Sequence, residues 1–197
     1  AQGFHCIKMK IGAIDFETEY QLLKNIRQEY APSDIELRVD ANGAFSPREA
    51  LEKLKRLADL QIHSIEQPIR AGQYEQMARL CEASPLPIAL DEELIGIACE
   101  KRKEEMLKII KPAYIILKPS LIGGYKGSEE WITLAQEQGV GWWITSALEG
   151  NVGLSAIAQW TYTLGNPMPQ GLGTGSLYTN NFPSSLEVKN GGLWWIK

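Results

Sequence analysis

Cysteine is scarce in this chain of 197 residues, which contains only Cys6, Cys81 and Cys99. An odd number of cysteines at wide intervals argues against a disulfide framework and against a zinc site, because both need closely ordered cysteines. Scattered cysteines of this kind are typical of buried, reduced thiols. We therefore expect a cytoplasmic protein.

Long apolar runs and basic clusters are also lacking. The longest apolar runs, such as YIIL at 114–117 and WWI at 142–144, are far shorter than a membrane-spanning helix, which needs about 20 residues. The net charge is −4, and no stretch is rich in lysine and arginine. We therefore expect neither nucleic acid nor a membrane as a partner.

Strand-like and helix-like segments alternate along the chain. Short apolar runs predict seven strands, at 5–10, 35–40, 63–66, 87–91, 114–118, 141–146 and 169–173. Amphipathic segments predict helices that begin after Asp15 and after Ser46, and further helices near 74–82, 101–110, 128–138 and 154–163. This alternation predicts an α/β fold with a parallel sheet, and no linker divides the chain.

The number of strands points to an incomplete barrel. A closed (β/α)₈ TIM barrel has eight strands and typically about 250 residues. The chain starts without methionine and enters a strand almost at once. We therefore expect a (β/α)7β-type TIM barrel that lacks its first strand. Residues 1–197 would form strands two to eight of a C-terminal catalytic barrel domain, a fragment of a longer protein.

Five charged residues each end one of the predicted strands at a spacing of 25 to 30 residues: Lys10, Asp40, Glu66, Asp91 and Lys118. That spacing is the size of one strand–helix unit, and the loops after the strands carry the chemistry of parallel barrels. One such residue alone is commonly a solvated loop residue, and Lys8 alone could form a salt bridge within its strand. Because burying a lone charge costs several kcal/mol, the ordered series favours an active site.

The three acids of this series are candidate metal ligands. Asp40, Glu66 and Asp91 would end neighbouring strands, which lie about 4.8 Å apart, so their carboxylates can converge on one ion. Oxygen ligands without histidine or cysteine favour Mg²⁺, with Mn²⁺ as a possible substitute.

The lysines are candidate acid–base groups. Lys10 and Lys118 would lie four strands apart in an eight-stranded ring and face a small-molecule carboxylate substrate from opposite sides. This arrangement suits removal of a proton α to a carboxylate beside a cation. An ordinary lysine is protonated at pH 7. Lys8 lies on the same face of the strand as Lys10, and its charge, together with the metal, is expected to lower the pKa of Lys10.

Five short motifs resemble the muconate cycloisomerase-like subgroup of the enolase superfamily. Enzymes of this superfamily use a lysine or histidine base with Mg²⁺. These motifs are IKMKIG at 7–12, VDANG at 39–43, IEQP at 65–68, LDE at 90–92 and LKPS at 117–120. The resemblance implies that Lys10 and Lys118 are catalytic and that the three acids bind Mg²⁺. Asn42 and Gln67 would adjoin the metal site, or could simply be turn residues. It also implies an N-terminal capping domain, which is missing here together with the first strand, so the isolated chain is expected to have weak activity or none.

The segment TSALEGNVGL at 145–154 is similar to the o-succinylbenzoate synthase family within that subgroup. This resemblance implies dehydration of 2-succinyl-6-hydroxy-2,4-cyclohexadiene-1-carboxylate to 2-succinylbenzoate in menaquinone biosynthesis. Lys10 would remove the α-proton and protonate the departing hydroxyl, and Lys118 would stabilise the dienolate. Ser146 could bind the succinyl tail, or could cap a helix. Gly173 could allow close approach of the substrate, or could shape a turn.

Other functions stay open at this point. A dipeptide epimerase, a muconate cycloisomerase or an N-acylamino acid racemase of the subgroup would share the metal and the lysines. The absence of an acid between Gly171 and Tyr178 counts against a dipeptide epimerase. A Schiff-base aldolase would use a strand-end lysine but leaves three carboxylates unexplained. An inactive scaffold fragment would show no change in melting temperature with Mg²⁺.

Overall fold

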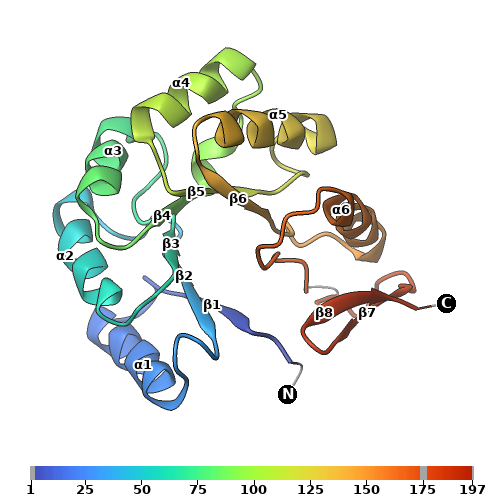
Figure 1. The fold of residues 1–197 in the computed structure, drawn as a ribbon, viewed down its shortest axis with the longest axis horizontal. Coiled ribbons are helices and arrows are strands. Elements are labelled where there is room, and N and C mark those ends of the chain that lie inside the picture. The colour runs from blue at the N-terminus through green and yellow to red at the C-terminus, as the bar shows by residue number, and fades with distance from the viewer. Residues whose placement is uncertain (1–2, 174–176, 197) are drawn as a thin grey trace.

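The computed structural model describes residues 3–173 and 177–196, which contain a curled sheet of six parallel strands (Figure 1). Adjacent strands pair in sequence order: β1 (Cys6–Lys10), β2 (Glu36–Asp40), β3 (Ser64–Glu66), β4 (Ile88–Leu90), β5 (Tyr114–Leu117) and β6 (Gly141–Ile144). The predicted α/β fold with a parallel sheet is confirmed.

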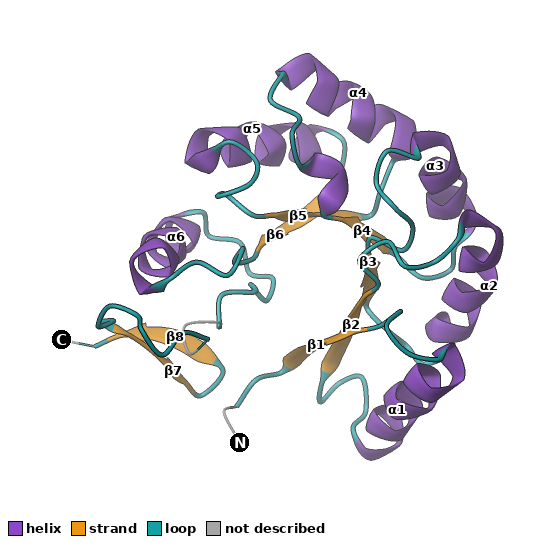
Figure 2. Cartoon of the chain, turned by 180° about the vertical axis from the view of Figure 1, so that it is seen from behind, coloured by secondary structure: helices purple, strands orange, loops and turns teal. Residues whose placement is uncertain are grey.

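Helices cover the outer side of the curled sheet, as Figures 1 and 2 show from opposite directions. They are α1 (Phe16–Glu29), α2 (Pro47–Ala58), α3 (Tyr74–Ala83), α4 (Glu100–Ile110), α5 (Gly124–Glu137) and α6 (Asn151–Thr163), with a short 3₁₀ helix η1 (Glu92–Leu94) after β4. None of the helices in the described part of the chain combines the length and the apolar composition that a bilayer crossing requires.

The caps that the sequence predicts for the first two helices are present. The Asp15 carboxylate accepts a hydrogen bond from the backbone N–H of Thr18, and Ser46 and Glu49 form a capping box ahead of Pro47. The predicted starts of two later helices were three to four residues late, because α5 begins at Gly124 and α6 at Asn151. Glycines precede both starts, and the apolar periodicity on which the prediction relied begins only one turn later.

The two faces of the sheet have separate apolar clusters. Residues such as Val39, Ile65 and Ile115 belong to the large core beneath the helices. Ala89, Ile116 and Trp143 form a second cluster, and the guanidinium of Arg38 lies 4.1 Å from the centroid of the Trp143 ring. Because side chains alternate along a strand, this second cluster fills the interior of the barrel below the strand ends.

The predicted seventh strand at 169–173 was wrong. This segment makes a single parallel bridge, between Thr145 and Gly171, and forms no strand. Pro169 has no N–H for a ladder, and Gly171 packs so closely on Thr145 that a Cβ would lie 2.4 Å from its hydroxyl oxygen. The segment therefore lies beside the end of β6 as an irregular chain, with backbone hydrogen bonds to it through Gly171.

An antiparallel ribbon of β7 (Leu186–Lys189) and β8 (Gly192–Trp195) was not predicted. Its turn is Asn190–Gly191, with φ of 50° and 72°. Such a dipeptide between two strand-like runs is a strong hairpin signal, and it could have identified the ribbon. The turn packs against Gly3, so the ribbon lies beside the start of the described chain (Figure 1).

Candidate active site

The five charged residues of the predicted series lie at one edge of the sheet. Lys10, Asp40 and Glu66 are the last residues of β1, β2 and β3, whereas Asp91 and Lys118 directly follow β4 and β5. The register pairs Lys10 with Asp40, and Asp40 with Glu66. Parallel pairing therefore produces a row of three acids with a lysine-bearing strand at each end of the row.

The three carboxylates are buried and paired with lysines. Asp40, Glu66 and Asp91 are each only 2% exposed. The Lys8 ammonium nitrogen lies 2.5 Å from Glu66 Oε2 and 3.4 Å from Asp40 Oδ2, and the Lys10 nitrogen lies 3.2 Å from the same Asp40 oxygen. Lys118 forms an ion pair with Asp91. The lysines of β1 thus pair with the acids at one end of the row, and Lys118 pairs with the acid at the other end.

Electrostatic coupling changes the ionisation of this row. Burial, together with the charges of Asp40 and Asp91, raises the pKa of Glu66 to about 8 against the opposing effect of Lys8. Burial lowers the pKa of Lys8, but the Glu66 and Asp40 carboxylates outweigh this effect and raise it above its ordinary value. Lys8 therefore keeps its positive charge beside Lys10, and its influence on Lys10 stays a prediction.

The row has features that fit a divalent cation and one that does not. Glu66 Oε1 is buried and has no hydrogen-bond partner among the residues that the structure describes, and two further acids raise the pKa of its carboxyl group. In residues 3–173 and 177–196 no three acidic, histidine or cysteine side chains are gathered about one point, and Glu66 and Asp91 are paired with Lys8 and Lys118 instead. An unpartnered, buried oxygen among hard oxygen donors is nevertheless a position that a cation such as Mg²⁺ can satisfy.

Asn42 links the first lysine to the loop after β4. Its Oδ1 accepts a hydrogen bond from the Lys10 ammonium, and its Nδ2 donates to Glu92 Oε1 at 2.7 Å. Its backbone N–H donates to Asp40 Oδ1 at 3.0 Å, and its φ of 43° turns the chain back over the rim. Asn42 therefore combines the two roles that the sequence left open, since it is both a turn residue and a neighbour of the acidic row.

The two predicted substrate contacts lie on different loops. Ser146 is in the loop after β6, and Gly173 is in the segment that follows Gly171. The Ser146 hydroxyl accepts a hydrogen bond from the backbone N–H of Leu148 at 2.8 Å. It does not cap α6, whose N-cap is Gly150. Gly173 is exposed, and a Cβ there would lie 3.4 Å from the Phe4 ring. Thr174 and Gly175, which follow Gly173, are outside the described residues.

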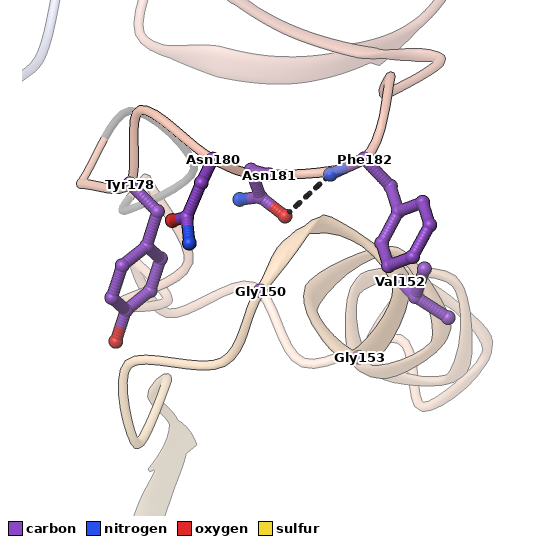
Figure 3. Close-up of a pocket in the computed structure, with 7 residues that line it drawn as sticks. All are labelled: Gly150, Val152, Gly153, Tyr178, Asn180, Asn181 and Phe182. Carbon is purple, nitrogen blue, oxygen red and sulfur yellow. Dashed lines mark hydrogen bonds between the residues drawn. The ribbon is translucent and has the colours of Figure 1, made fainter.

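A pocket of about 390 Å³ opens at the start of α6 (Figure 3). It is lined by Gly150, Val152, Gly153, Tyr178, Asn180, Asn181 and Phe182. Asn181 Oδ1 accepts the backbone N–H groups of Asn151 and Phe182, and the Tyr178 hydroxyl donates to Leu148 O at 2.7 Å. The lining includes none of the lysines or carboxylates of the row.

Glu19 on α1 was missed by the sequence analysis, although it shapes the loop after Lys10. This acid is buried, and its carboxylate accepts the backbone N–H groups of Gly12, Ala13 and Ile14 at 2.8–3.2 Å. It lies four residues before the fully buried Leu23. An acid on the core-facing stripe of a helix was the signal that could have found it.

Replacing Glu19 by alanine should lower the free energy of unfolding by about 2–3 kcal/mol, because three loop N–H groups lose their shared acceptor. Urea unfolding of the full-length protein measures this loss. The matched control is Glu29→Ala, an exposed acid on the same helix, which should change stability by less than about 0.5 kcal/mol. Equal effects of the two variants would contradict the role given to Glu19.

Comparison with known proteins identifies the family. Residues 1–194 match the family described as enolase C-terminal domain-like. The chain belongs to this family. The predicted membership of the enolase superfamily is thereby confirmed, and so is the barrel-like fold of parallel strands with outer helices.

Individual relatives of this enolase C-terminal domain-like chain differ widely in similarity. It is 61% identical over 193 residues to the o-succinylbenzoate synthase of Desulfotalea psychrophila, and this match covers 98% of the chain and 52% of the relative. The crystal structure of MenC from that organism superposes with a TM-score of 0.93 at 57% identity, covering 98% of this chain and 53% of that one. The L-Ala-D/L-Glu epimerase of Bacillus subtilis is 29% identical over 159 residues, which are 80% of the chain and 42% of the epimerase. The chain thus spans about half the length of its curated relatives.

Proposed function

We propose that the protein containing this chain is a Mg²⁺-dependent lyase that dehydrates 2-succinyl-6-hydroxy-2,4-cyclohexadiene-1-carboxylate to 2-succinylbenzoate, a step of menaquinone biosynthesis. The row of three buried carboxylates between two lysine-bearing strands carries the proposal. The 61% identity to an o-succinylbenzoate synthase supports this substrate over those of other members of the superfamily. The L-Ala-D/L-Glu epimerase is less than half as similar, so epimerisation is the weaker alternative.

Asp40, Glu66 and Asp91 would hold Mg²⁺, or Mn²⁺ in its place, once their carboxylates turn from the lysines toward one point. When bound, the cation would supply positive charge beside the substrate carboxylate. With the carboxylates turned away, the lysines would no longer be held in ion pairs with them. The amine of Lys10 could then act on the substrate, helped by the 69% exposure of its side chain.

One lysine performs the proton transfers of this mechanism, and the other stabilises charge. Lys10 removes the proton α to the carboxylate and then delivers a proton to the departing hydroxyl, so that water leaves and the ring becomes aromatic. Lys118, at the other end of the row, keeps its proton and stabilises the negative charge that develops on the ring. In the structure, Lys8 stays charged beside Lys10, held by its ion pairs with Glu66 and Asp40.

The loops after β6 would bind the succinyl tail. Ser146 and Gly173 are the proposed contacts, and the pocket at the start of α6 lies on the same loop as Ser146. The Tyr178 hydroxyl already bonds to Leu148 in that loop, so it can hold the pocket wall in place.

The length of the relatives suggests a further partner. Since the chain spans about half of them, we propose that residues 1–197 act as the C-terminal catalytic barrel domain together with an N-terminal capping domain of the same protein. The prediction of buried thiols was wrong, because Cys6 and Cys81 are half-buried and Cys99 is exposed. The cytoplasmic location predicted from the sequence stays a proposal.

The function is tested by incubating the full-length protein with the cyclohexadiene substrate and Mg²⁺ and measuring 2-succinylbenzoate by mass spectrometry. Product should form, should stop with EDTA and should return with added Mg²⁺. L-Ala-L-Glu should remain unepimerised in a parallel incubation. Epimerised dipeptide without 2-succinylbenzoate would favour the epimerase instead, and a substrate adduct on lysine trapped by borohydride would favour the Schiff-base aldolase.

The raised pKa of Glu66 gives cation binding a defined pH dependence. Below about pH 8 this carboxyl group is largely protonated, and a cation must displace the proton. The apparent affinity for Mn²⁺ should therefore rise by up to about tenfold per pH unit toward pH 8 and become constant above it. Titrations between about pH 6 and about pH 9 measure this slope. Glu66→Gln should lack the dependence on pH, and a flat profile in the wild-type protein would contradict the assignment.

A further inference from the structure

Gln67 follows the proposed ligand Glu66 and lies where three rim loops meet. Its side chain uses all four of its hydrogen-bonding positions. Oε1 accepts the backbone N–H groups of Asp91 at 3.2 Å and Glu93 at 3.4 Å, while Nε2 donates to Ile69 O at 3.0 Å and to Glu93 Oε2 at 2.8 Å.

The backbone of Gln67 adds the third loop. Its carbonyl accepts the N–H of Gly43, in the loop after β2, and its own N–H donates to Ala89 O at 2.9 Å. Its φ of 39° lies in the left-handed region, where a non-glycine residue needs support from its surroundings. The side-chain contacts to the loop after β4 supply that support.

Glu93 completes the unit from the other side. Its Oε1 accepts the backbone N–H of Gly72 at 2.7 Å, in the loop after β3, and its Oε2 accepts from Gln67. Gln67 is 1% exposed and Glu93 is 4% exposed. A buried polar pair with every contact satisfied is rigid, because breaking any one contact leaves a buried group unpaired.

We propose that Gln67 and Glu93 are a positioning pair that fixes the backbones of Glu66 and Asp91 relative to each other, so that their carboxylates can bind one cation. Among the described residues, the side chains of Gln67 and Glu93 form no hydrogen bond with the carboxylates of Glu66 and Asp91. Its action is through the main chain, since Gln67 adjoins Glu66 and holds the Asp91 N–H. This inference rests on the proposed metal site. It assigns a positioning role to two residues that the proposed mechanism does not use.

The test measures Mn²⁺ binding to the full-length protein by electron paramagnetic resonance, which reports free Mn²⁺ directly. Glu93→Gln keeps the size of the side chain but sets an amide N–H₂ against either the Gln67 amide or the Gly72 N–H. Gln67→Met removes all four side-chain contacts. Both variants should raise the Kd for Mn²⁺ by about 10- to 100-fold, the cost typical of losing a group that orients a metal ligand.

Lys103→Met is the control for a general loss of stability. Lys103 is as deeply buried as Gln67, and it donates to Gly127 O and Glu130 between α4 and α5, away from the rim. This variant should lose stability, measured by its melting temperature, but keep the wild-type Kd within about twofold. If Gln67→Met does not fold, Glu93→Gln decides the question alone.

The outcomes separate the inference from the proposed function. A folded Glu93→Gln protein with wild-type affinity for Mn²⁺ would overturn the positioning pair and leave the metal site intact. A Lys103→Met protein that loses affinity to the same extent would overturn it as well. Wild-type protein that binds no Mn²⁺ would overturn the metal site itself, and the inference with it.

Discussion

Replacing Lys10 by alanine in the full-length protein is expected to lower kcat for formation of 2-succinylbenzoate by about 10⁴-fold, the upper end of what one acid–base group contributes. The loss is large because the same amine both removes the α-proton and protonates the leaving hydroxyl. Lys10 ends β1 and is mostly exposed, so its removal should leave the fold intact. Steady-state kinetics and a thermal unfolding curve measure the two properties separately.

A second lysine provides the control for this substitution. Lys24→Ala removes an exposed lysine from α1, away from the strand ends, and should retain wild-type kcat and melting temperature. Asn42, which accepts a hydrogen bond from Lys10, stays available to water in Lys10→Ala. Near-normal kcat in Lys10→Ala would show that another group is the base.

Asp40→Asn should weaken Mn²⁺ binding by at least about 100-fold, because removing a metal ligand lowers the affinity more than removing a group that only orients a ligand. The substitution preserves the size of the side chain and the acceptor for the Asn42 N–H, but it removes the charge that faces Lys8 and Lys10. Turnover should fall in parallel and recover in part at high Mg²⁺ concentration. Mn²⁺ titration and kinetics at increasing Mg²⁺ check both expectations.

Glu52→Gln is the matched control for Asp40→Asn, since it removes the charge of an exposed acid on α2. Its affinity for Mn²⁺ should equal that of the wild-type protein. Unchanged affinity in Asp40→Asn would remove Asp40 from the metal site and would leave its burial beside two lysines as a structural ion-pair network.

The strand ends could be predicted from the sequence because each combines an apolar run with a terminal charge at a regular spacing. Asp40 and Glu66 illustrate this: a buried parallel strand needs apolar residues along its length, and only its end can place a charge at a rim. Strand order followed from the short strand–helix repeat, which leaves neighbouring strands adjacent in space. The membership of the superfamily was identified from the motifs at these same ends.

The supporting contacts could not be predicted in the same way. Gln67 and Glu93 bind backbone groups of distant loops, and no periodic pattern specifies a partner 21 or more residues away, as for Glu93 with Gly72 and Gln67 with Asp91. The segment at 169–173 was predicted as a strand, yet its proline and glycines prevent a regular ladder of hydrogen bonds. Tertiary packing decides these positions, whereas local pattern decides the strand ends.

The central claim is that Asp40, Glu66 and Asp91 hold one divalent cation between the two lysines. Anomalous diffraction from crystals of the full-length protein grown with Mn²⁺ locates such an ion directly. We expect one peak per chain with an oxygen atom of each of the three carboxylates within about 2.3 Å, close to the bond lengths of hard divalent ions. A peak bound by other residues, or no peak at this rim while the lysines keep their ion pairs with the acids, would contradict the account.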